Sequence, residues 1–217
     1  MRKIYFDTET TGLNCKDCQI IELAMLIYED DEKILEYDEF INVGYKLPPK
    51  IIELTGITDE MVQNGADEKD VASFLKENLT SDTLMIAHNC QFDLSFVYQL
   101  LYRHYPDEAL DIVSDMDWLD TLTVLKDRKK YPHKLIDGVN HYDISEVNFH
   151  RAIDDTKALY DLTSAMKNER DDLREYINIF GYNPKYGVSG GIFPFITYKK
   201  QDFNNRMVSS NSILPNK

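Results

Sequence analysis

The chain has 217 residues, 43% of them hydrophobic and 12% aromatic, and this composition excludes an intrinsically disordered protein. The formal net charge of −14 argues against a broad surface that coats nucleic acid, but it is compatible with a narrow site in which divalent cations offset acidic side chains. No apolar run is long enough to cross a bilayer, no signal peptide opens the chain and three cysteines form no disulfide framework, so we expect a cytoplasmic protein without a membrane partner.

The first half of the chain predicts a sheet followed by helices. Residues 4–12 begin with an apolar run that predicts a strand. Residues 20–28 and 33–43 predict two antiparallel strands joined by an acidic turn. The further elements expected in this half are a helical turn at 51–58, an amphipathic helix at 67–78 and a short buried strand at 84–87.

The second half predicts mainly helices. The expected elements are a helix from 93 to about 105, a fifth strand at 118–121, a helix to about 126, a helix at 135–142 and a longer helix at 150–167. A chain that begins with strands and then interleaves helices with them predicts an α/β layered domain over residues 1–168. We expect its site at the edge of the sheet where strands end and helices begin. Residues 169–217 predict a small C-terminal extension, with a turn at 181–184, extended aromatic structure at 187–198 and disorder over about the last ten residues.

Two carboxylates stand where the first strand ends. Asp7 and Glu9 are one residue apart, and because side chains alternate along a strand they point to the same face. Like charges at the end of a buried strand are costly unless a cation lies between them. Oxygen-only ligands suit Mg²⁺ or Mn²⁺, so the pair predicts a metal site; the alternative is that the strand has ended and both acids are solvated.

Two further acids fall on apolar helix stripes. Asp93 lies four residues before Val97 on the inward stripe of its helix. Asp155 lies one turn before Leu159 on the inward stripe of the last long helix, whereas Asp154 does not. A core-facing carboxylate is costly unless it is paired or ligated, and no lysine or arginine shares either stripe. The acids therefore indicate a metal site, with a buried salt bridge as the alternative.

Three segments combine these acids with other polar residues in a recognisable order. They are Asp7-x-Glu9-Thr10-Thr11-Gly12, His88-Asn89-x-x-Phe92-Asp93 and His150-Arg151-Ala152-x-x-Asp155, with Leu54-Thr55-Gly56-Ile57-Thr58 and Asp120-Thr121 as further landmarks. Together they resemble the three exonuclease motifs of the DnaQ-like, or DEDDh, 3′→5′ exonuclease family, over residues 1–168 and at familiar spacing. The resemblance implies a ribonuclease H-like, three-layer fold with a five-stranded mixed sheet.

The resemblance also implies roles for individual residues. Asp7, Glu9, Asp93 and Asp155 would bind two divalent metal ions, Mg²⁺ or Mn²⁺, and His150 would be the general base. The implied reaction is the hydrolysis of phosphodiester bonds at DNA 3′ ends, single-stranded or frayed, with release of nucleoside 5′-monophosphates. This is a reaction of the proofreading or repair type, in which a polymerase or repair partner would fit, although no segment identifies one.

Residues close to the catalytic set are candidates for contacts with substrate. Thr10 could hold the terminal 3′ hydroxyl and Asn89 a phosphate, while Leu13, Leu54 and Phe92 could pack against the last bases. For the two leucines, ordinary core packing is the alternative.

Other features leave alternatives open. The basic run Lys126–Lys134 predicts either a solvated loop or a surface that steers phosphate. An RNA-trimming exoribonuclease of the same family is a second candidate function, which a contact to the 2′ hydroxyl would distinguish. A catalytically inactive nucleic-acid-binding module is a third, and the presence of all five catalytic residues argues against it.

Overall fold

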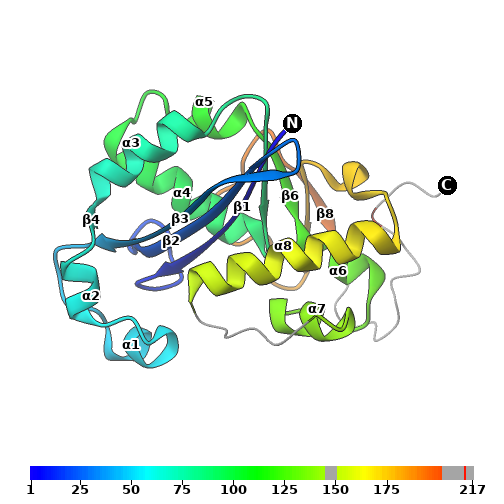
Figure 1. Ribbon diagram of the computed structural model, residues 1–217, viewed down its shortest axis with the longest axis horizontal. Coiled ribbons are helices and arrows are strands. Elements are labelled where there is room, and N and C mark those ends of the chain that lie inside the picture. The colour runs from blue at the N-terminus through cyan, green and yellow to red at the C-terminus, as the bar shows by residue number, and fades with distance from the viewer. Residues whose placement is uncertain (145–150, 202–212, 214–217) are drawn as a thin grey trace.

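The sheet at the centre of the protein has strands in both directions (Figure 1). The computed structural model describes residues 1–144, 151–201 and 213. Within them, six strands lie in the order β4-β3-β2-β1-β5-β6. The strands are β1 (Arg2–Thr10), β2 (Ile20–Glu29), β3 (Glu32–Asn42), β4 (Ala66–Asp67), β5 (Thr83–Ala87) and β6 (Asp117–Asp120). β2 pairs antiparallel with β1 and β3, whereas the other neighbouring pairs are parallel.

This topology confirms the predicted α/β fold and adds one strand to the predicted five. The extra strand, β4, has two residues and is too short to show the alternation from which a strand is predicted. A Cβ at Gly65 would lie 2.3 Å from the carbonyl oxygen of Phe40, so only glycine lets the chain approach β3 this closely. The sixth strand therefore depends on a close backbone approach and not on a side-chain pattern.

Helices cover both faces of the sheet and produce three layers (Figure 1). α8 (Ala152–Glu169) crosses one face, and α3 (Glu68–Asn78), α4 (Cys90–His104) and α5 (Ala109–Ser114) lie against the other. The remaining α-helices of the described residues are α1 (Pro49–Thr55), α2 (Asp59–Gln63), α6 (Thr121–Arg128) and α7 (Leu135–His141). The sequence does not predict α2 or α5, because helices of five and six residues are too short to display an apolar stripe. Among the described helices, none has the length and apolar character needed to span a bilayer.

Alternation along β1 assigns its side chains to two separate cores. Ile4 and Phe6 are buried in the core beneath α4, and Tyr5 is buried in the core beneath α8. Odd-numbered residues of β1 therefore face α8, and even-numbered residues face α4. The same alternation decides on which face each polar side chain at the end of β1 lies.

The chain after α8 returns to the core beneath α4. A 3₁₀ turn, η1 (Leu173–Tyr176), leads into a two-stranded parallel sheet of β7 (Ile179–Tyr182) and β8 (Thr197–Lys200). Phe180, Phe193 and Ile196 from this part of the chain are buried in that core. Aromatic residues of the extension thus pack beside α4, the helix that carries Asp93.

Two predictions for the extension differ from the structure. The predicted turn at 181–184 is wrong at its start, because Gly181 and Tyr182 belong to β7. Of the predicted extended segment 187–198, only residues 197 and 198 lie in a strand, because the chain turns at residues 194–196, between the buried residues Phe193 and Ile196 and β8. The predicted disordered tail lies outside the described residues, apart from Ile213.

Candidate active site

Three carboxylates meet where β1 ends and α8 begins. Asp7, Glu9 and Asp155 each offer one oxygen atom, and these atoms lie within 4.8 Å of one another. Asp7 and Glu9 reach this place because odd-numbered residues of β1 face α8, and Asp155 reaches it from the first turn of that helix. Among the described residues, the adjacent acid Asp154 is not part of the group.

Asp93 approaches from the other face of the sheet. It lies in the first turn of α4 and is only 3% exposed. Its Oδ1 accepts a 2.7 Å hydrogen bond from Oγ1 of Thr8, the residue of β1 that points toward α4. Asp93 is not in the group of three carboxylates that lie within 4.8 Å. The structure thus brings three of the four predicted metal ligands together and places the fourth across the strand from them.

Burial and repulsion raise the pKa values of these acids. Burial raises the pKa of Asp7 well above its ordinary value, and the charges of Asp93 and Asp155 act in the same direction. Burial, followed by the charges of Asp155 and Glu22, raises the pKa of Glu9 to about 7. Burial raises the pKa of Asp93 to about 7, although the hydrogen bond from β1 opposes the shift. Each acid is therefore hard to ionise unless a positive charge is added.

The donor set fits hard divalent cations. Carboxylate oxygens are the ligands that Mg²⁺ and Mn²⁺ prefer in proteins. Among the described residues, no lysine or arginine forms an ion pair with Asp7 or Glu9, so none of the described basic side chains neutralises these two acids. A bound divalent cation would compensate the repelling charges and lower the raised pKa values. The chemistry of these residues is therefore that of a metal site.

Asp120 holds the turn that leads into α4, the helix that carries Asp93. Its Oδ1 accepts hydrogen bonds from the backbone amides of Asn89 (2.9 Å) and Cys90 (3.1 Å), one turn before Asp93. The same carboxylate caps the N-terminus of α6. Asn89 has a φ of 71°, so the chain turns sharply as it enters α4. Asp120 therefore connects the ends of β5 and β6 and orients the first turn of α4.

The sequence analysis missed one residue beside the site, Glu22. This residue is fully buried on β2 and lies opposite Glu9 in the β1–β2 register. Its Oε1 lies 2.8 Å from Nη2 of Arg151, immediately before α8. The signal that could have revealed it is a lone acid within the apolar run 20–28, since a charged residue in a strand buried on both faces needs a specific partner.

The five predicted substrate-contact residues differ in their accessibility. Leu13 and Leu54 are 89% and 59% exposed, so the alternative of core packing is wrong for both. Thr10 is buried and donates a 2.7 Å hydrogen bond to the carbonyl two residues ahead. Phe92 is partly buried against the main core, and Asn89 occupies the tight turn before α4. The two leucines therefore remain available to a ligand, while the other three also have structural contacts.

Two other predicted features have different outcomes. His150, the predicted general base, lies outside the described residues, so its role stays a prediction. In the basic run, Arg128 is buried and forms ion pairs with Glu169 and Asp172, and Lys129 also pairs with Glu169. The predicted role in steering phosphate is therefore wrong for Arg128. This side chain instead connects the end of α6 to the end of α8.

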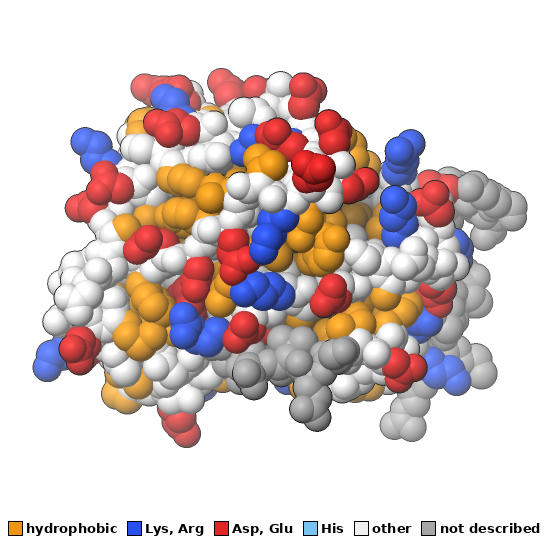
Figure 2. Space-filling model, in the orientation of Figure 1, with side chains coloured by type: hydrophobic (Ala, Val, Ile, Leu, Met, Phe, Trp, Pro, Cys, Tyr) orange, Lys and Arg blue, Asp and Glu red, His pale blue; other side chains and the backbone are white. Residues whose placement is uncertain are grey.

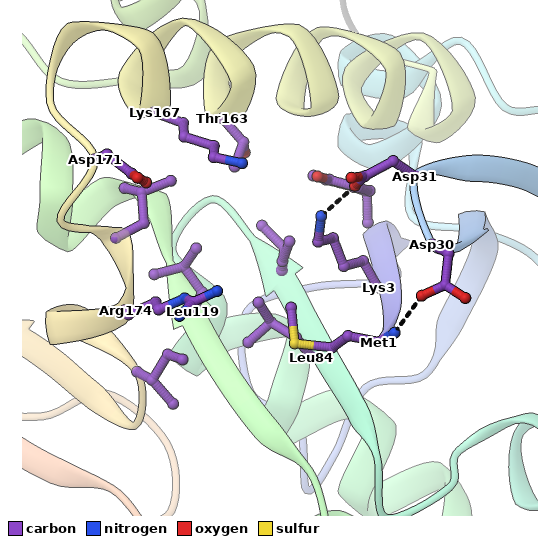
Figure 3. A pocket seen from close by; sticks show the side chains of 14 residues that line it. Met1, Lys3, Asp30, Asp31, Leu84, Leu119, Thr163, Lys167, Asp171 and Arg174 are labelled. Carbon is purple, nitrogen blue, oxygen red and sulfur yellow. Dashed lines mark hydrogen bonds and ion pairs between the residues drawn. The ribbon is translucent and has the colours of Figure 1, made fainter.

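A cavity of about 430 Å³ (Figure 3) is lined by side chains from the start of β1. It is lined by Met1 and Lys3 at the start of β1 and by Thr163 and Lys167 in the last part of α8. The carboxylates lie at the end of β1 and in the first turn of α8. The cavity is therefore separate from the candidate active site.

The surface of the protein is consistent with a localised site. Figure 2 shows acidic and basic side chains interspersed on the face that α8 crosses, without a continuous basic area among the described residues. The formal net charge of the whole chain is −14. The described residues of this face therefore offer no extended electrostatic attraction for a nucleic acid.

Comparison with known sequences gives a match over most of the chain. The RNase_T exonuclease family matches residues 4–163. The PolC-type DNA polymerase III of Bacillus subtilis is 36% identical over 160 residues, and that of Latilactobacillus sakei is 32% identical over 189 residues. These regions cover 71% and 85% of this chain but only 11% and 12% of the polymerases, so the chain spans about a tenth of their length.

Comparison with solved structures supports the same fold. Escherichia coli exonuclease I in complex with a dA16 oligonucleotide has a TM-score of 0.70 at 19% identity, and the match covers 81% of this chain and 42% of that chain. A moderately thermophilic exonuclease I from Methylocaldum szegediense has a TM-score of 0.68 at 18% identity and covers 79% and 41%. At these identities the likeness concerns the fold, which is ribonuclease H-like.

The exonuclease family match, together with the acidic side chains gathered at the end of the first strand, places this α/β domain in the class of metal-dependent nucleases, which are hydrolases. The family match and the PolC-type relatives then make the assignment specific: the chain belongs to the DnaQ-like 3′→5′ exonuclease family. The resemblance drawn from the three motifs is confirmed.

Proposed function

We propose that this chain removes nucleotides one at a time from the 3′ ends of DNA, single-stranded or frayed, and releases nucleoside 5′-monophosphates. The observation that carries the proposal is the group of Asp7, Glu9 and Asp155, whose carboxylate oxygens lie within 4.8 Å of one another. DNA as the substrate is supported by the PolC-type relatives, which are DNA polymerases, and by the dA16 oligonucleotide held by Escherichia coli exonuclease I. We assign the exonuclease domain to residues 1–168 and treat residues 169–217 as an extension, a division that the family match over 4–163 supports.

The proposed chemistry divides the work between the acids and a histidine. Asp7, Glu9 and Asp155 would hold a divalent cation, Mg²⁺ or Mn²⁺, and Asp93 would contribute to a second one from across the strand. When bound, two such ions supply an activated water and compensate the charge on the departing 3′ oxygen. His150 would accept the proton of the attacking water, a role that suits a histidine with an ordinary pKa of about 6.5.

The proposed substrate contacts use the five side chains that the sequence predicted. Leu13 and Leu54 would pack against the last bases, as expected of an enzyme that does not read sequence. Thr10 and Asn89 would hold the 3′ hydroxyl and a phosphate, and Phe92 would support the terminal base. A DNA polymerase is the partner that the relatives suggest, because the matching segments belong to DNA polymerase chains. The cytoplasmic location expected from the sequence stays a prediction.

The decisive experiment is the digestion of matched oligonucleotides labelled at the 5′ end. Single- and double-stranded DNA and RNA of the same sequence are incubated with the protein and Mg²⁺ or Mn²⁺. We expect a ladder of products that shorten stepwise from the 3′ end of DNA, and complete inhibition by EDTA. The Asp7→Ala variant, which should fold normally, controls for a contaminating nuclease.

The other outcomes of this experiment distinguish the alternatives. Faster shortening of RNA would favour the exoribonuclease alternative, and labelled fragments of intermediate length that form in one cut, without a stepwise ladder, would indicate an endonuclease. Phosphorothioate linkages at the 3′ end should block digestion if the enzyme works from that end. Binding without any cleavage under all these conditions would support an inactive nucleic-acid-binding module and refute the proposed function.

A further inference from the structure

Glu22 is a buried carboxylate that the proposed chemistry does not use. It is 0% exposed, within a strand that contributes buried side chains to all three hydrophobic clusters of the described residues. A charge buried in this way requires close partners. Both of its oxygens have hydrogen-bond partners among the residues at which α8 starts.

The contacts of Glu22 reach both the side chain and the backbone at the start of α8. Oε1 accepts a 2.9 Å hydrogen bond from Nε of Arg151 and lies 2.8 Å from Nη2 of the same guanidinium. Oε2 accepts a 3.1 Å hydrogen bond from the backbone amide of Ala152, the first residue of the helix. Ala152 is itself 0% exposed, so this end of the helix has little room to shift.

Arg151 is held from a second direction by β3. Its guanidinium lies 5.0 Å from the centre of the Phe40 ring and 3.8 Å from Oδ2 of Asp38. An arginine whose Nε and Nη2 both contact one carboxylate oxygen and whose guanidinium lies over an aromatic ring has few alternative positions. Arg151 therefore ties the start of α8 to two neighbouring strands at once.

This network leads directly to Asp155. The backbone amide of Asp155 donates a 3.0 Å hydrogen bond to the carbonyl oxygen of Arg151, in the first turn of α8. The side chain of Asp155 in turn lies in one group with Asp7 and Glu9, and Glu9 is the residue opposite Glu22 in the sheet. Glu22 therefore contacts the start of α8, the start of α8 positions Asp155, and Asp155 lies beside two acids of β1.

We propose that Glu22 is a positioning residue that sets the affinity of the three-carboxylate group for a divalent cation. It does so by holding the start of α8 in the place where Asp155 meets Asp7 and Glu9. The inference rests on the proposed function only in taking this group to be a metal site. Residues behind metal ligands commonly change metal affinity or activity by about 10–100-fold when substituted, because ligand geometry must be accurate.

The test is the binding of Mn²⁺ by the full chain in the absence of nucleic acid, measured by calorimetry or by the paramagnetic resonance signal of free Mn²⁺. Glu22→Gln keeps the size of the side chain but removes the charge that holds Arg151. We expect the affinity for Mn²⁺ to fall at least 10-fold, with nuclease activity largely recovered at saturating Mn²⁺.

The matched control is Glu36→Gln, which removes an ion pair of 2.8 Å between β3 and Lys157 in the next turn of α8. We expect this control to bind Mn²⁺ within about twofold of the native affinity.

A double-mutant cycle distinguishes positioning from a general effect on stability. If Glu22 acts through Asp155, then Glu22→Gln should weaken Mn²⁺ binding strongly in the native background and hardly further in an Asp155→Asn background. A merely structural role predicts a lower melting temperature with unchanged Mn²⁺ affinity, and that result would overturn the proposal.

A second variant keeps the test decisive if Glu22→Gln fails to fold. Arg151→Lys retains the positive charge beside the buried acid but cannot reproduce the fork, so it should also weaken Mn²⁺ binding. Native Mn²⁺ affinity in this variant would count against the inference. Because the deciding readout is the affinity for Mn²⁺, a native protein that binds Mn²⁺ but degrades no nucleic acid would refute the proposed function and leave this inference standing.

Discussion

Thr8 Oγ1 donates a 2.7 Å hydrogen bond to Oδ1 of Asp93 and so joins the end of β1 to the first turn of α4. Thr8 stands between two acids of the same strand that point to the opposite face. Its hydroxyl is therefore the contact through which β1, which carries two predicted ligands, also orients a third.

The first prediction concerns the hydroxyl of Thr8. Thr8→Val preserves the shape of the side chain but leaves Asp93 without this donor, and the hydrogen bond is one of the influences that lower the pKa of Asp93. We expect the free energy of unfolding to fall by about 1–3 kcal/mol and nuclease activity to fall about 10-fold. Thr163→Val is the control, because within the described part of the chain the hydroxyl of this buried threonine bonds only to a backbone carbonyl of α8, two turns away from Asp155. Equal activity in the two variants would contradict the prediction.

The second prediction concerns the repulsion at Asp7. Burial raises its pKa well above the ordinary value, with the charges of Asp93 and Asp155 acting in the same direction, so a neutral isostere relieves an unfavourable interaction. Asp7→Asn should stabilise the metal-free protein by about 1 kcal/mol at pH 8, measured by chemical unfolding in EDTA. The same variant should lose at least about 10³-fold in nuclease activity, because it loses a metal ligand worth several kcal/mol in the transition state.

The matched control for this variant is Asp154→Asn. Asp154 is the neighbour of Asp155 on α8 but does not belong to the three-carboxylate group. We expect its activity to stay within about twofold of native and the stability in EDTA to change by less than about 0.5 kcal/mol. Loss of activity in Asp154→Asn, or full activity in Asp7→Asn, would show that the site is assigned to the wrong acids.

The third prediction is a pH dependence of the metal-free protein. Burial, with repulsion from neighbouring acids, raises the pKa of Glu9 from 4.5 to about 7, and burial raises that of Asp93 from 3.8 to about 7. Between the ordinary and the raised pKa values, the folded protein keeps these two carboxyl groups protonated, whereas the unfolded chain has released the protons. The stability of the folded protein therefore falls as the pH rises. We expect the melting temperature in EDTA to decrease between about pH 4.5 and pH 7, by roughly 2–4 °C for each kcal/mol lost.

Addition of a divalent metal ion should counteract this fall in melting temperature at higher pH. A divalent cation that binds only the folded protein stabilises it by about 2.7 kcal/mol at a hundred times its dissociation constant. Mn²⁺ should therefore raise the melting temperature more at pH 8 than at pH 5, where protons compete for the carboxylates. A Glu9→Gln/Asp93→Asn variant should show a flatter pH profile in EDTA. A native profile without any slope over this range would disprove the raised pKa values.

The fourth prediction concerns the attachment of the C-terminal extension to α4. Gln91 Nε2 donates to the carbonyl oxygens of Ser189 (2.9 Å) and Gly191 (2.6 Å), and Tyr198 donates its hydroxyl to Gln91 Oε1 at 2.9 Å. Gln91→Leu would leave these groups without their partner, which we expect to cost about 2–3 kcal/mol in the free energy of unfolding. Limited proteolysis should then cleave within residues 183–194.

The control on the same helix is Gln99→Leu. The side chain of Gln99 makes no hydrogen bond to the described part of the chain, so its replacement should change the free energy of unfolding by less than about 0.5 kcal/mol. If residues 183–194 stay resistant to protease in Gln91→Leu, the extension is held mainly by Phe193 and its neighbours in the core, and the hydrogen bonds contribute little.

Local periodicity in the sequence was sufficient for much of the fold and of the candidate site. Alternation along β1 correctly predicts that Asp7 and Glu9 share a face, because the side-chain direction in a strand depends on the next residues only. The apolar stripes of α4 and α8 are likewise local, and they single out Asp93 and Asp155. The strands predicted at 20–28, 33–43 and 84–87 correspond to β2, β3 and β5 for the same reason.

The remaining features depend on contacts between distant parts of the chain. Asp93 bonds to Thr8, 85 residues away, and lies on the other face of the sheet from Asp7, which no spacing within a motif could reveal. Glu22 meets Arg151 across 129 residues, and Gln91 holds a carbonyl 100 residues further along. The sequence by itself determined which face of its own strand or helix each side chain occupies. Only the packing of the layers decided which of those faces meet, because that depends on distances that local periodicity does not contain.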